Sequence, residues 1–235
     1  MEFFERLNKA FKLLDYTATE EELDKFFKFY NELVEYNKNV NLTAITNVDD
    51  FIYKHIIDSL IPYNFISQFS TVLDVGAGAG FPSIPLKIIK PKLRITCLDS
   101  VNKKVTWLNY IKKQLNLFDF DAIHGRCEDL ACDYRYRESF DCVVARGVAN
   151  LSTLIEYCVP FVKTGGYFIA YKASDFKNEL LCAKNAIKLL NIKLFKTINF
   201  YNENIGERNV LIFKKIDKTS VKYPRKQNKP RLNPL

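Results

Sequence analysis

The chain has few of the residues that build metal centres and disulfide frameworks. Its 235 residues include only two histidines, far apart, and no two of its six cysteines stand in a CxxC pair. No apolar run approaches the length of a membrane span, and the N-terminus has acids where a signal peptide has a basic start. We therefore expect a cytoplasmic protein with no metal and no membrane anchor, whose cysteines stay reduced: residues 97, 127, 132, 142, 158 and 182.

Glycine is also scarce, with eight in the chain, yet three of the eight stand within five residues. Gly76, Gly78 and Gly80 directly follow the apolar run 72–75, which is typical of a buried strand. Pro82 comes next, where a helix can begin. A strand, a glycine turn and a helix start direct backbone N–H groups toward a ligand, so this stretch is the candidate ligand-binding loop.

The glycine spacing narrows the choice of ligand. A dinucleotide site has the pattern G-x-G-x-x-G, and here the third glycine position is held by Phe81. Asp74, two residues before the loop, would repel a pyrophosphate and suits a ligand with an amino group. S-adenosylmethionine has an amino group and no phosphate, so we favour it over a nicotinamide cofactor. An ordinary tight turn between strand and helix remains the alternative.

Charge is unevenly distributed along the chain. Residues 1–70 contain seven basic and twelve acidic residues, a net charge of −5, whereas residues 71–235 carry a net charge of +13. The basic excess belongs to the ligand-binding part and the tail, which points to a polyanionic partner such as nucleic acid. A basic surface that only keeps the protein soluble is the alternative.

The order of the segments predicts an α/β fold. Residues 1–67 are predicted to be helical, with a capping box at Thr19 and a later helix over about 49–67. From residue 71 strands alternate with helices, as in a parallel sheet covered on both faces. The last two strands are too close for a helix between them, so they should form an antiparallel hairpin. The seven expected strands are 71–75, 94–99, 119–124, 140–145, 166–171, 195–200 and 208–215.

Ligands of such sheets bind at the carboxyl ends of the strands, and the residues there are candidates. Asp99 ends the second strand and can accept hydrogen bonds from ribose hydroxyls; a helix N-cap is its alternative role. Cys127 and Glu128 follow the third strand, where a carboxylate or a backbone carbonyl can accept from the N6 amino group of adenine. The alternative for Glu128 is a simple surface acid.

Three further residues are candidates on the substrate side. Arg146 ends the fourth strand and could bind RNA phosphate or guanine O6, or else pair with Asp141 or Glu128. Lys172 ends the fifth strand, where it could either contact a phosphate or simply be solvated. His55 lies beside the apolar stripe of its helix, where a hydrogen-bonded packing role competes with a catalytic one.

The last 18 residues, from position 218, have six basic residues, three prolines and no acid. Their prolines argue against a helix, and an extended basic segment can follow a phosphate backbone. A disordered solubilising tail is the alternative. The RNA-contact candidates are Lys222, Tyr223, Arg225, Lys226, Lys229 and Arg231, with the tyrosine available to stack on a base.

Together these motifs resemble the bacterial small-subunit ribosomal RNA guanine-N7 methyltransferase family, once called the glucose-inhibited division protein B family. The resemblance covers nearly the whole chain, and its most specific landmarks are the opening Asn-Leu-Thr, the His-x-x-Asp-Ser-Leu segment and the Tyr-Pro-Arg tail. The full set of landmarks is Asn41-Leu-Thr-Ala, His55-Ile-Ile-Asp-Ser-Leu, Asp74-Val-Gly-Ala-Gly-Ala-Gly-Phe-Pro, Gly125-Arg-Cys-Glu, Ala145-Arg-Gly-Val-Ala and Tyr223-Pro-Arg.

The resemblance implies a Rossmann-like class I S-adenosylmethionine-dependent methyltransferase with a mostly parallel seven-stranded sheet. It implies methyl transfer to N7 of one guanosine in 16S rRNA near the decoding site. The parts would be an N-terminal helical extension (1–67), a methyltransferase domain (68–217) and a basic tail (218–235), in a protein that acts as a monomer on the small ribosomal subunit. The expected cofactor-binding residues are Asp74, Gly76, Gly78, Phe81, Asp99, Cys127, Glu128 and Arg146.

Three positions depart from the usual family pattern. Ser83 stands in place of glycine, Cys127 in place of alanine and Gly147 in place of alanine. Each is an exchange between small residues, so it affects loop detail rather than activity. We expect Cys127 to contribute only its backbone.

The chemistry of guanine N7 shapes the expected mechanism. N7 carries an unprotonated lone pair at neutral pH, so its attack on a sulfonium methyl group needs no general base and depends on in-line positioning. We expect Asn41, His55, Arg146 and Lys172 to hold the flipped base and its flanking phosphates. A methyltransferase for tRNA or protein, and a non-catalytic RNA-binding protein on the same fold, remain the alternative functions.

Overall fold

The computed structural model describes all residues, 1–235. Its centre is a seven-stranded sheet of order β3-β2-β1-β4-β5-β7-β6. The pairs among β1 to β5 are parallel, and β7 runs antiparallel to both β5 and β6. The strands are β1 (Thr71–Val75), β2 (Arg94–Asp99), β3 (Phe120–His124), β4 (Phe140–Arg146), β5 (Val162–Lys172), β6 (Ile192–Asn202) and β7 (Gly206–Lys215).

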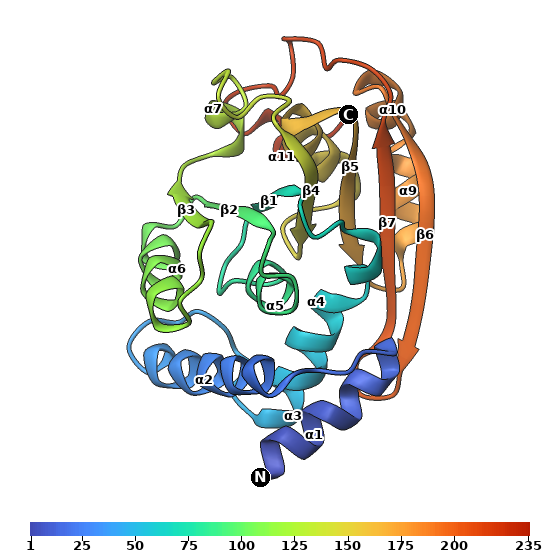
Figure 1. The fold of residues 1–235 in the computed structure, drawn as a ribbon. Helices are drawn as coiled ribbons and strands as arrows, with labels where there is room; N and C mark the ends of the chain where they lie inside the picture. Colours follow the sequence, from blue (N-terminus) through green and yellow to red (C-terminus); the bar gives the residue numbers. More distant parts are fainter.

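The predicted seven strands and the closing hairpin are therefore confirmed, and the largest difference is that β5 and β6 are longer than expected. Helices cover both faces of the sheet (Figure 1). The α-helices are α1 (Glu2–Phe11), α2 (Glu20–Asn37), α3 (Val48–Asp50), α4 (Asp58–Leu60), α5 (Ser83–Ile89), α6 (Asn102–Gln114), α7 (Cys127–Leu130), α8 (Leu151–Cys158), α9 (Phe176–Cys182), α10 (Lys184–Leu189) and α11 (Lys229–Leu232).

Alternation along the strands creates two cores, because successive side chains point to opposite faces of the sheet. Val72 of β1 packs with the N-terminal helices, α5 and α6, around the buried Trp107. Leu73, one residue on, packs with α8, α9 and α10 on the other face. Continuous burial on both faces explains why the central strands are almost wholly apolar.

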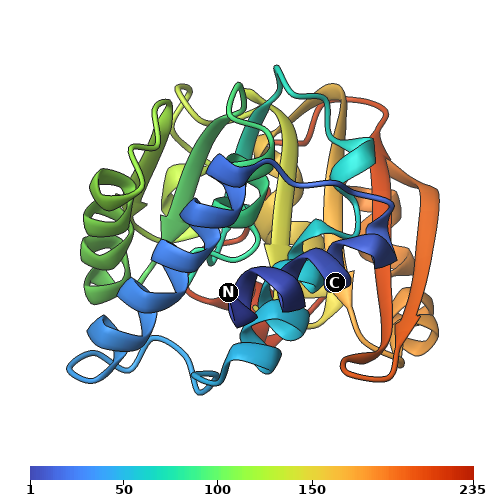
Figure 2. The same cartoon turned by 60° about the horizontal axis from the view of Figure 1, so that its bottom comes forward.

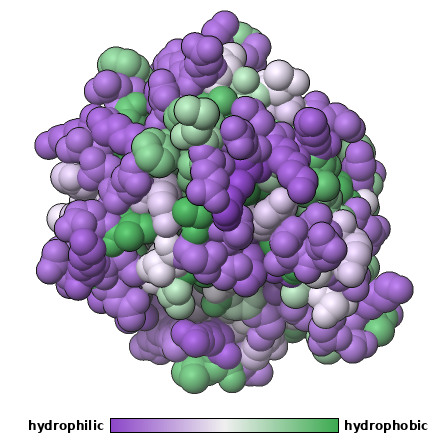
Figure 3. All heavy atoms as spheres, turned by 90° about the horizontal axis from the view of Figure 1, so that it is seen from below, coloured by the Kyte–Doolittle hydropathy of each residue, from purple (hydrophilic) through white to green (hydrophobic).

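The N-terminal helices lie across one face of the sheet, as Figure 2 shows. The capping box at Thr19 is present: its side chain accepts from the Glu22 backbone N–H, and Glu22 accepts in return from the Thr19 backbone. Phe26, Phe29 and Leu33 of α2 are buried in the same core as β1. Seen from below, the surface over these helices is mostly hydrophilic, with only small separate apolar spots (Figure 3).

The helix expected over 49–67 is continuous only from Val48 to Leu60, and it is not α-helical throughout. A π-helix, Phe51–Ile57, follows α3, and α4 ends at Leu60. Short 3-10 segments stand at Lys12–Leu14, Tyr63–Phe65 and Val159–Phe161. π-helical turns occur often at functional sites, because they shift side chains out of α-helical register. Here the wider turn carries His55.

Two other helix expectations also need correction. The span after Asp175 forms two helices, α9 and α10, instead of one, with the break at Ala183. The tail includes a short helix, α11, instead of being wholly extended; Pro230 stands in its first turn, where a proline is tolerated. No helix is both long and apolar enough to cross a membrane.

Candidate active site

The glycine loop lies at the carboxyl end of β1, between two cavities. The larger, of about 310 Å³, extends toward the ends of β2 and β3, and the smaller, of about 200 Å³, extends toward the π-helix. Gly76 lines both cavities. It has a φ of +74°, and a Cβ placed on it would come within 2.6 Å of a Val148 methyl group, so the close approach depends on glycine.

Asp99 holds the loop from the neighbouring strand. Its Oδ2 accepts from the Gly78 backbone N–H at 2.9 Å, and its Oδ1 accepts from the Val101 backbone N–H at 2.9 Å. The side chain lines the larger cavity. The N-cap alternative is not realised, because α6 has Val101 as its N-cap residue and no side-chain capping bond.

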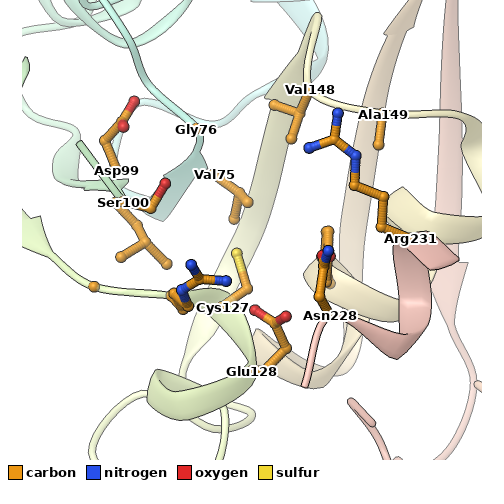
Figure 4. A pocket seen from close by; sticks show the side chains of 14 residues that line it. Val75, Gly76, Asp99, Ser100, Cys127, Glu128, Val148, Ala149, Asn228 and Arg231 are labelled. Atoms are coloured by element: carbon orange, nitrogen blue, oxygen red, sulfur yellow. The ribbon is translucent and has the colours of Figure 1, made fainter. Parts of the chain in front are cut away.

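Cys127 and Glu128 form the wall of the larger cavity opposite Gly76 (Figure 4). Glu128 is only 6% exposed, so it is not a surface acid, and no protein group donates a hydrogen bond to its carboxylate. Burial raises the pKa of the Cys127 thiol to about 12, so this sulfur stays protonated and unreactive. The cavity thus offers two acidic side chains at the ends of adjacent strands, in positions suited to ribose hydroxyls and an amino group.

The smaller cavity is lined by three planar side chains that contact one another. The His55 ring stacks on Phe81, with ring centroids 4.0 Å apart and an interplanar angle of 12°. The Arg146 guanidinium lies 5.3 Å from the centre of the same phenyl ring. The three residues also line the cavity with the loop residues Gly76 and Gly78.

Both nitrogens of His55 are engaged within the protein. Arg146 Nη2 donates to His55 Nδ1 at 3.1 Å, which leaves Nε2 as the protonated nitrogen, donating to Thr43 Oγ1 at 3.0 Å. Burial, together with the Arg146 charge, lowers the pKa of His55 to about 3. The ring is therefore neutral at physiological pH and has no free lone pair with which to accept a proton.

Arg146 is anchored by the segment that carries His55. Its Nη1 donates to the Lys54 carbonyl at 2.9 Å and to Asp58 Oδ2 at 2.6 Å. Asp58 also pairs with Arg208 at 3.2 Å. The alternative reading of Arg146, an ion pair with Asp141 or Glu128, is wrong in its partners: the carboxylate that pairs with it is Asp58, three residues after His55 in the His-x-x-Asp-Ser-Leu landmark.

Asp74 lines neither cavity, which corrects the expectation of a direct contact with a cofactor amino group. It is wholly buried beneath the loop, where its Oδ2 accepts from the Ser83 backbone N–H at 3.2 Å. Its Oδ1 has no partner in the protein. Burial raises the pKa of this carboxyl to about 7, so the neutral form is strongly populated near neutral pH.

Lys172 is not available for a phosphate, nor is it a solvated strand end. Its Nζ pairs with Glu179 at 2.6 Å and donates to the Ala149 carbonyl at 3.0 Å, and its side chain is 8% exposed. Asn41 is exposed and lines neither cavity, whereas its neighbours Leu42 and Thr43 line the smaller one. Asn41 as a base-holding residue therefore stays a prediction, and Lys172 in that role is wrong.

Thr43 and Asn37 were missed by sequence reasoning. Asn37 Oδ1 accepts from the backbone N–H groups of Leu42 and Thr43, and its Nδ2 donates to the Thr43 carbonyl. This side chain fixes the turn that presents Thr43 to His55. The Asn-Leu-Thr landmark contained the signal for Thr43, whereas Asn37 looked only like the end of a helix.

Comparisons with known proteins identify the family of the chain. A family model described as "GidB: rRNA small subunit methyltransferase G" matches residues 22–211. The chain belongs to this family. Ribosomal RNA small subunit methyltransferase G of Clostridium kluyveri is 42% identical to the chain over the full length of both proteins. The proteins of that name from Brevibacillus brevis and Staphylococcus epidermidis are 45% and 46% identical, over 93% and 90% of each chain.

Solved structures confirm the predicted methyltransferase fold for this family member. The ribosomal protein L11 methylase of Lactobacillus delbrueckii aligns with a TM-score of 0.55 at 16% identity, over 70% of this chain and 80% of its own. M. jannaschii TYW2 in complex with AdoMet aligns with a TM-score of 0.53 at 18% identity, over 68% and 76%. At these identities the likeness concerns the fold alone.

Proposed function

We propose that this protein transfers a methyl group from S-adenosylmethionine to N7 of a guanosine in 16S rRNA of the small ribosomal subunit. The observation that carries the proposal is the pair of cavities that meet at Gly76. One offers acids placed for a nucleoside, and the other is lined by His55, Phe81 and Arg146. Family membership supports the substrate class, since relatives over 40% identical are named for small-subunit ribosomal RNA.

The residues of the larger cavity fit the cofactor. The unpaired Glu128 carboxylate suits the adenine amino group, Asp99 keeps acceptor capacity for ribose hydroxyls, and Gly76 leaves room where a Cβ would intrude. The amino acid part would then pass Gly76 toward the smaller cavity. When bound, S-adenosylmethionine supplies an electrophilic methyl group on a positively charged sulfur.

The chain's own residues act by positioning. Guanine N7 needs no deprotonation, and His55 has no free lone pair to offer. The stacked ring of His55, Phe81 and the guanidinium of Arg146 form a planar, aromatic-rich wall against which a flipped purine can be held. Holding N7 in line with the methyl group is the main contribution that such a wall can make to the rate.

His55 should contribute no acid limb to the pH profile of the single-turnover rate of methyl transfer between about 5.5 and 8.5. The pKa of His55 is lowered to about 3, so the ring stays neutral throughout this range, and the titration expected within it is that of Asp74, whose pKa is raised to about 7. The rate is measured with saturating cofactor and small-subunit particles as substrate.

A His55→Asn variant separates positioning from base catalysis. The asparagine Oδ1 can replace Nδ1 as the acceptor for Arg146, so we expect the variant to keep the rate within about tenfold of wild type. A loss of a thousandfold or more, in a folded variant that still binds cofactor, would show that His55 does chemistry.

RNA recognition is proposed for the exposed basic residues of the tail. Lys222, Lys226 and Lys229 are exposed on the tail and free to contact phosphate. Tyr223 is partly buried against the core and Arg225 pairs with Glu156, so neither side chain is freely available to RNA. We retain the proposed division into a helical extension (1–67), a catalytic domain (68–217) and a tail (218–235).

The function is tested by methyl transfer onto small ribosomal subunits from a strain that lacks this modification, with the modified base mapped. A single new 7-methylguanosine in 16S rRNA is expected. Methylation of tRNA or protein in place of 16S rRNA would contradict the substrate. Cofactor uptake without any transfer would favour the non-catalytic RNA-binding alternative.

A further inference from the structure

The C-terminal tail is folded back onto the catalytic domain. After β7 the chain crosses toward α7 and returns as α11, which packs against α8 (Figure 1). Arg137 binds the first part of the tail: its guanidinium donates to the backbone carbonyls of Thr219, Ser220 and Tyr223. Glu138 accepts from the Thr219 backbone N–H at 2.8 Å.

The second part of the tail is fastened to α8. Arg225 Nη2 pairs with Glu156 at 2.7 Å, and Glu156 is completely buried. Thr153 Oγ1 donates to the carbonyl of the buried Pro230 at 2.8 Å. Because a buried carboxylate without its partner is costly, these contacts keep the tail in one position.

This position brings two tail side chains to the larger cavity. Asn228 and Arg231 line it together with Asp99 and Glu128 (Figure 4). Tyr157 donates to Asn228 Oδ1 at 3.3 Å, so the amide nitrogen remains free to donate. The guanidinium of Arg231 makes no hydrogen bond or ion pair within the protein and extends from α11 into the cavity.

We propose that Asn228 and Arg231 contact the adenosine half of S-adenosylmethionine, so that the tail forms one wall of the cofactor site. This inference rests on the proposed function only in the identity of the cofactor. Both residues line the cavity of Asp99 and Glu128, and neither lines the cavity of His55 and Arg146. A planar guanidinium suits the face of a purine, and an amide N–H suits a ring nitrogen or a ribose hydroxyl.

The proposal predicts that cofactor binding stabilises the folded tail and that the folded tail strengthens cofactor binding. A ligand that contacts the folded tail must stabilise it by the same free energy that the tail contributes to binding. S-adenosylhomocysteine should therefore slow tryptic cleavage after Lys226 and Arg231 by about tenfold when the ligand is saturating. Unchanged cleavage with saturated ligand would overturn the proposal, and this readout needs no variant.

Calorimetry without RNA tests the two residues directly. Arg231→Ala and Asn228→Ala should each raise the Kd for S-adenosylhomocysteine by about tenfold, the effect of one lost polar contact. They should raise the Kd for 5′-methylthioadenosine, which lacks the amino acid part, by the same factor. Lys218→Ala, which removes an exposed charge of the tail outside the cavity, is the matched control and should change neither Kd.

Unchanged affinities in both variants would overturn the proposal, as would a loss confined to S-adenosylhomocysteine, since that would place Arg231 on the amino acid part. The proposed function fails separately. Suppose that the wild-type protein binds both nucleosides and that the variants lose affinity as expected, but that the wild-type protein does not methylate 16S rRNA. The proposed role of the tail is then supported, and the proposed substrate is wrong.

Discussion

Replacing Arg146 by lysine should lower the single-turnover rate of methyl transfer by about a hundredfold or more. The guanidinium contacts the Lys54 carbonyl, Asp58 and His55 Nδ1 at once, and an ammonium group cannot reproduce this planar fork. The His55 ring would lose the donor that fixes its tautomer. Since a displacement of about 1 Å in a positioned site costs about a hundredfold in rate, the loss should appear mainly in the chemical step.

Arg208→Lys is the matched control, because Arg208 pairs with the same Asp58 but does not line the smaller cavity. We expect this variant to retain the rate within about threefold. The readout is the rate with saturating cofactor on small-subunit particles, together with the melting temperature of each variant. A wild-type rate in Arg146→Lys, or an equal loss in both variants, would contradict a specific role for Arg146.

Much of the sheet could be predicted because its signals are local. The apolar run before Gly76 is buried on both faces, so it had to be nearly free of polar residues, and this made β1 visible. The hairpin followed from the short link between β6 and β7, which leaves no room for a crossover. Asp99 and Glu128 were found for a related reason, since strand order places the carboxyl ends of β2 and β3 side by side.

The remaining features depend on tertiary contacts that local patterns do not encode. The π-helix at His55 keeps the hydrophobic spacing of an α-helix, so its wider turn left no signal. Lys172 forms an ion pair with Glu179, and Arg225 forms one with Glu156, which stands 69 residues earlier in the chain. A basic, proline-containing tail is typical of a free RNA-binding arm, and its return onto the domain depends on long-range partners such as Arg137 and the buried Glu156.

Replacing Asp99 by alanine should raise the Kd for S-adenosylhomocysteine by about a hundredfold or more. The carboxylate accepts from two loop N–H groups, of Gly78 and Val101, and it faces the cavity where ribose hydroxyls are proposed to bind. Each hydrogen bond to a charged acceptor contributes about 1.5–3 kcal/mol. Losing the two proposed bonds to the ribose hydroxyls amounts to about 3–6 kcal/mol, and about 1.4 kcal/mol corresponds to tenfold in affinity.

Asp121→Ala provides the comparison for Asp99→Ala. It removes the same charge from the adjacent strand β3, at an exposed side chain that pairs only with Lys112. The Kd of Asp121→Ala should stay within about twofold of wild type. The Kd of Asp99→Asn should lie between those of Asp121→Ala and Asp99→Ala, because the amide keeps one acceptor oxygen but sets an N–H donor against a backbone N–H. If Asp99→Ala binds the nucleoside as tightly as wild type at an unchanged melting temperature, the ribose does not lie at the end of β2. The cofactor would then have to occupy the cavities in a different orientation.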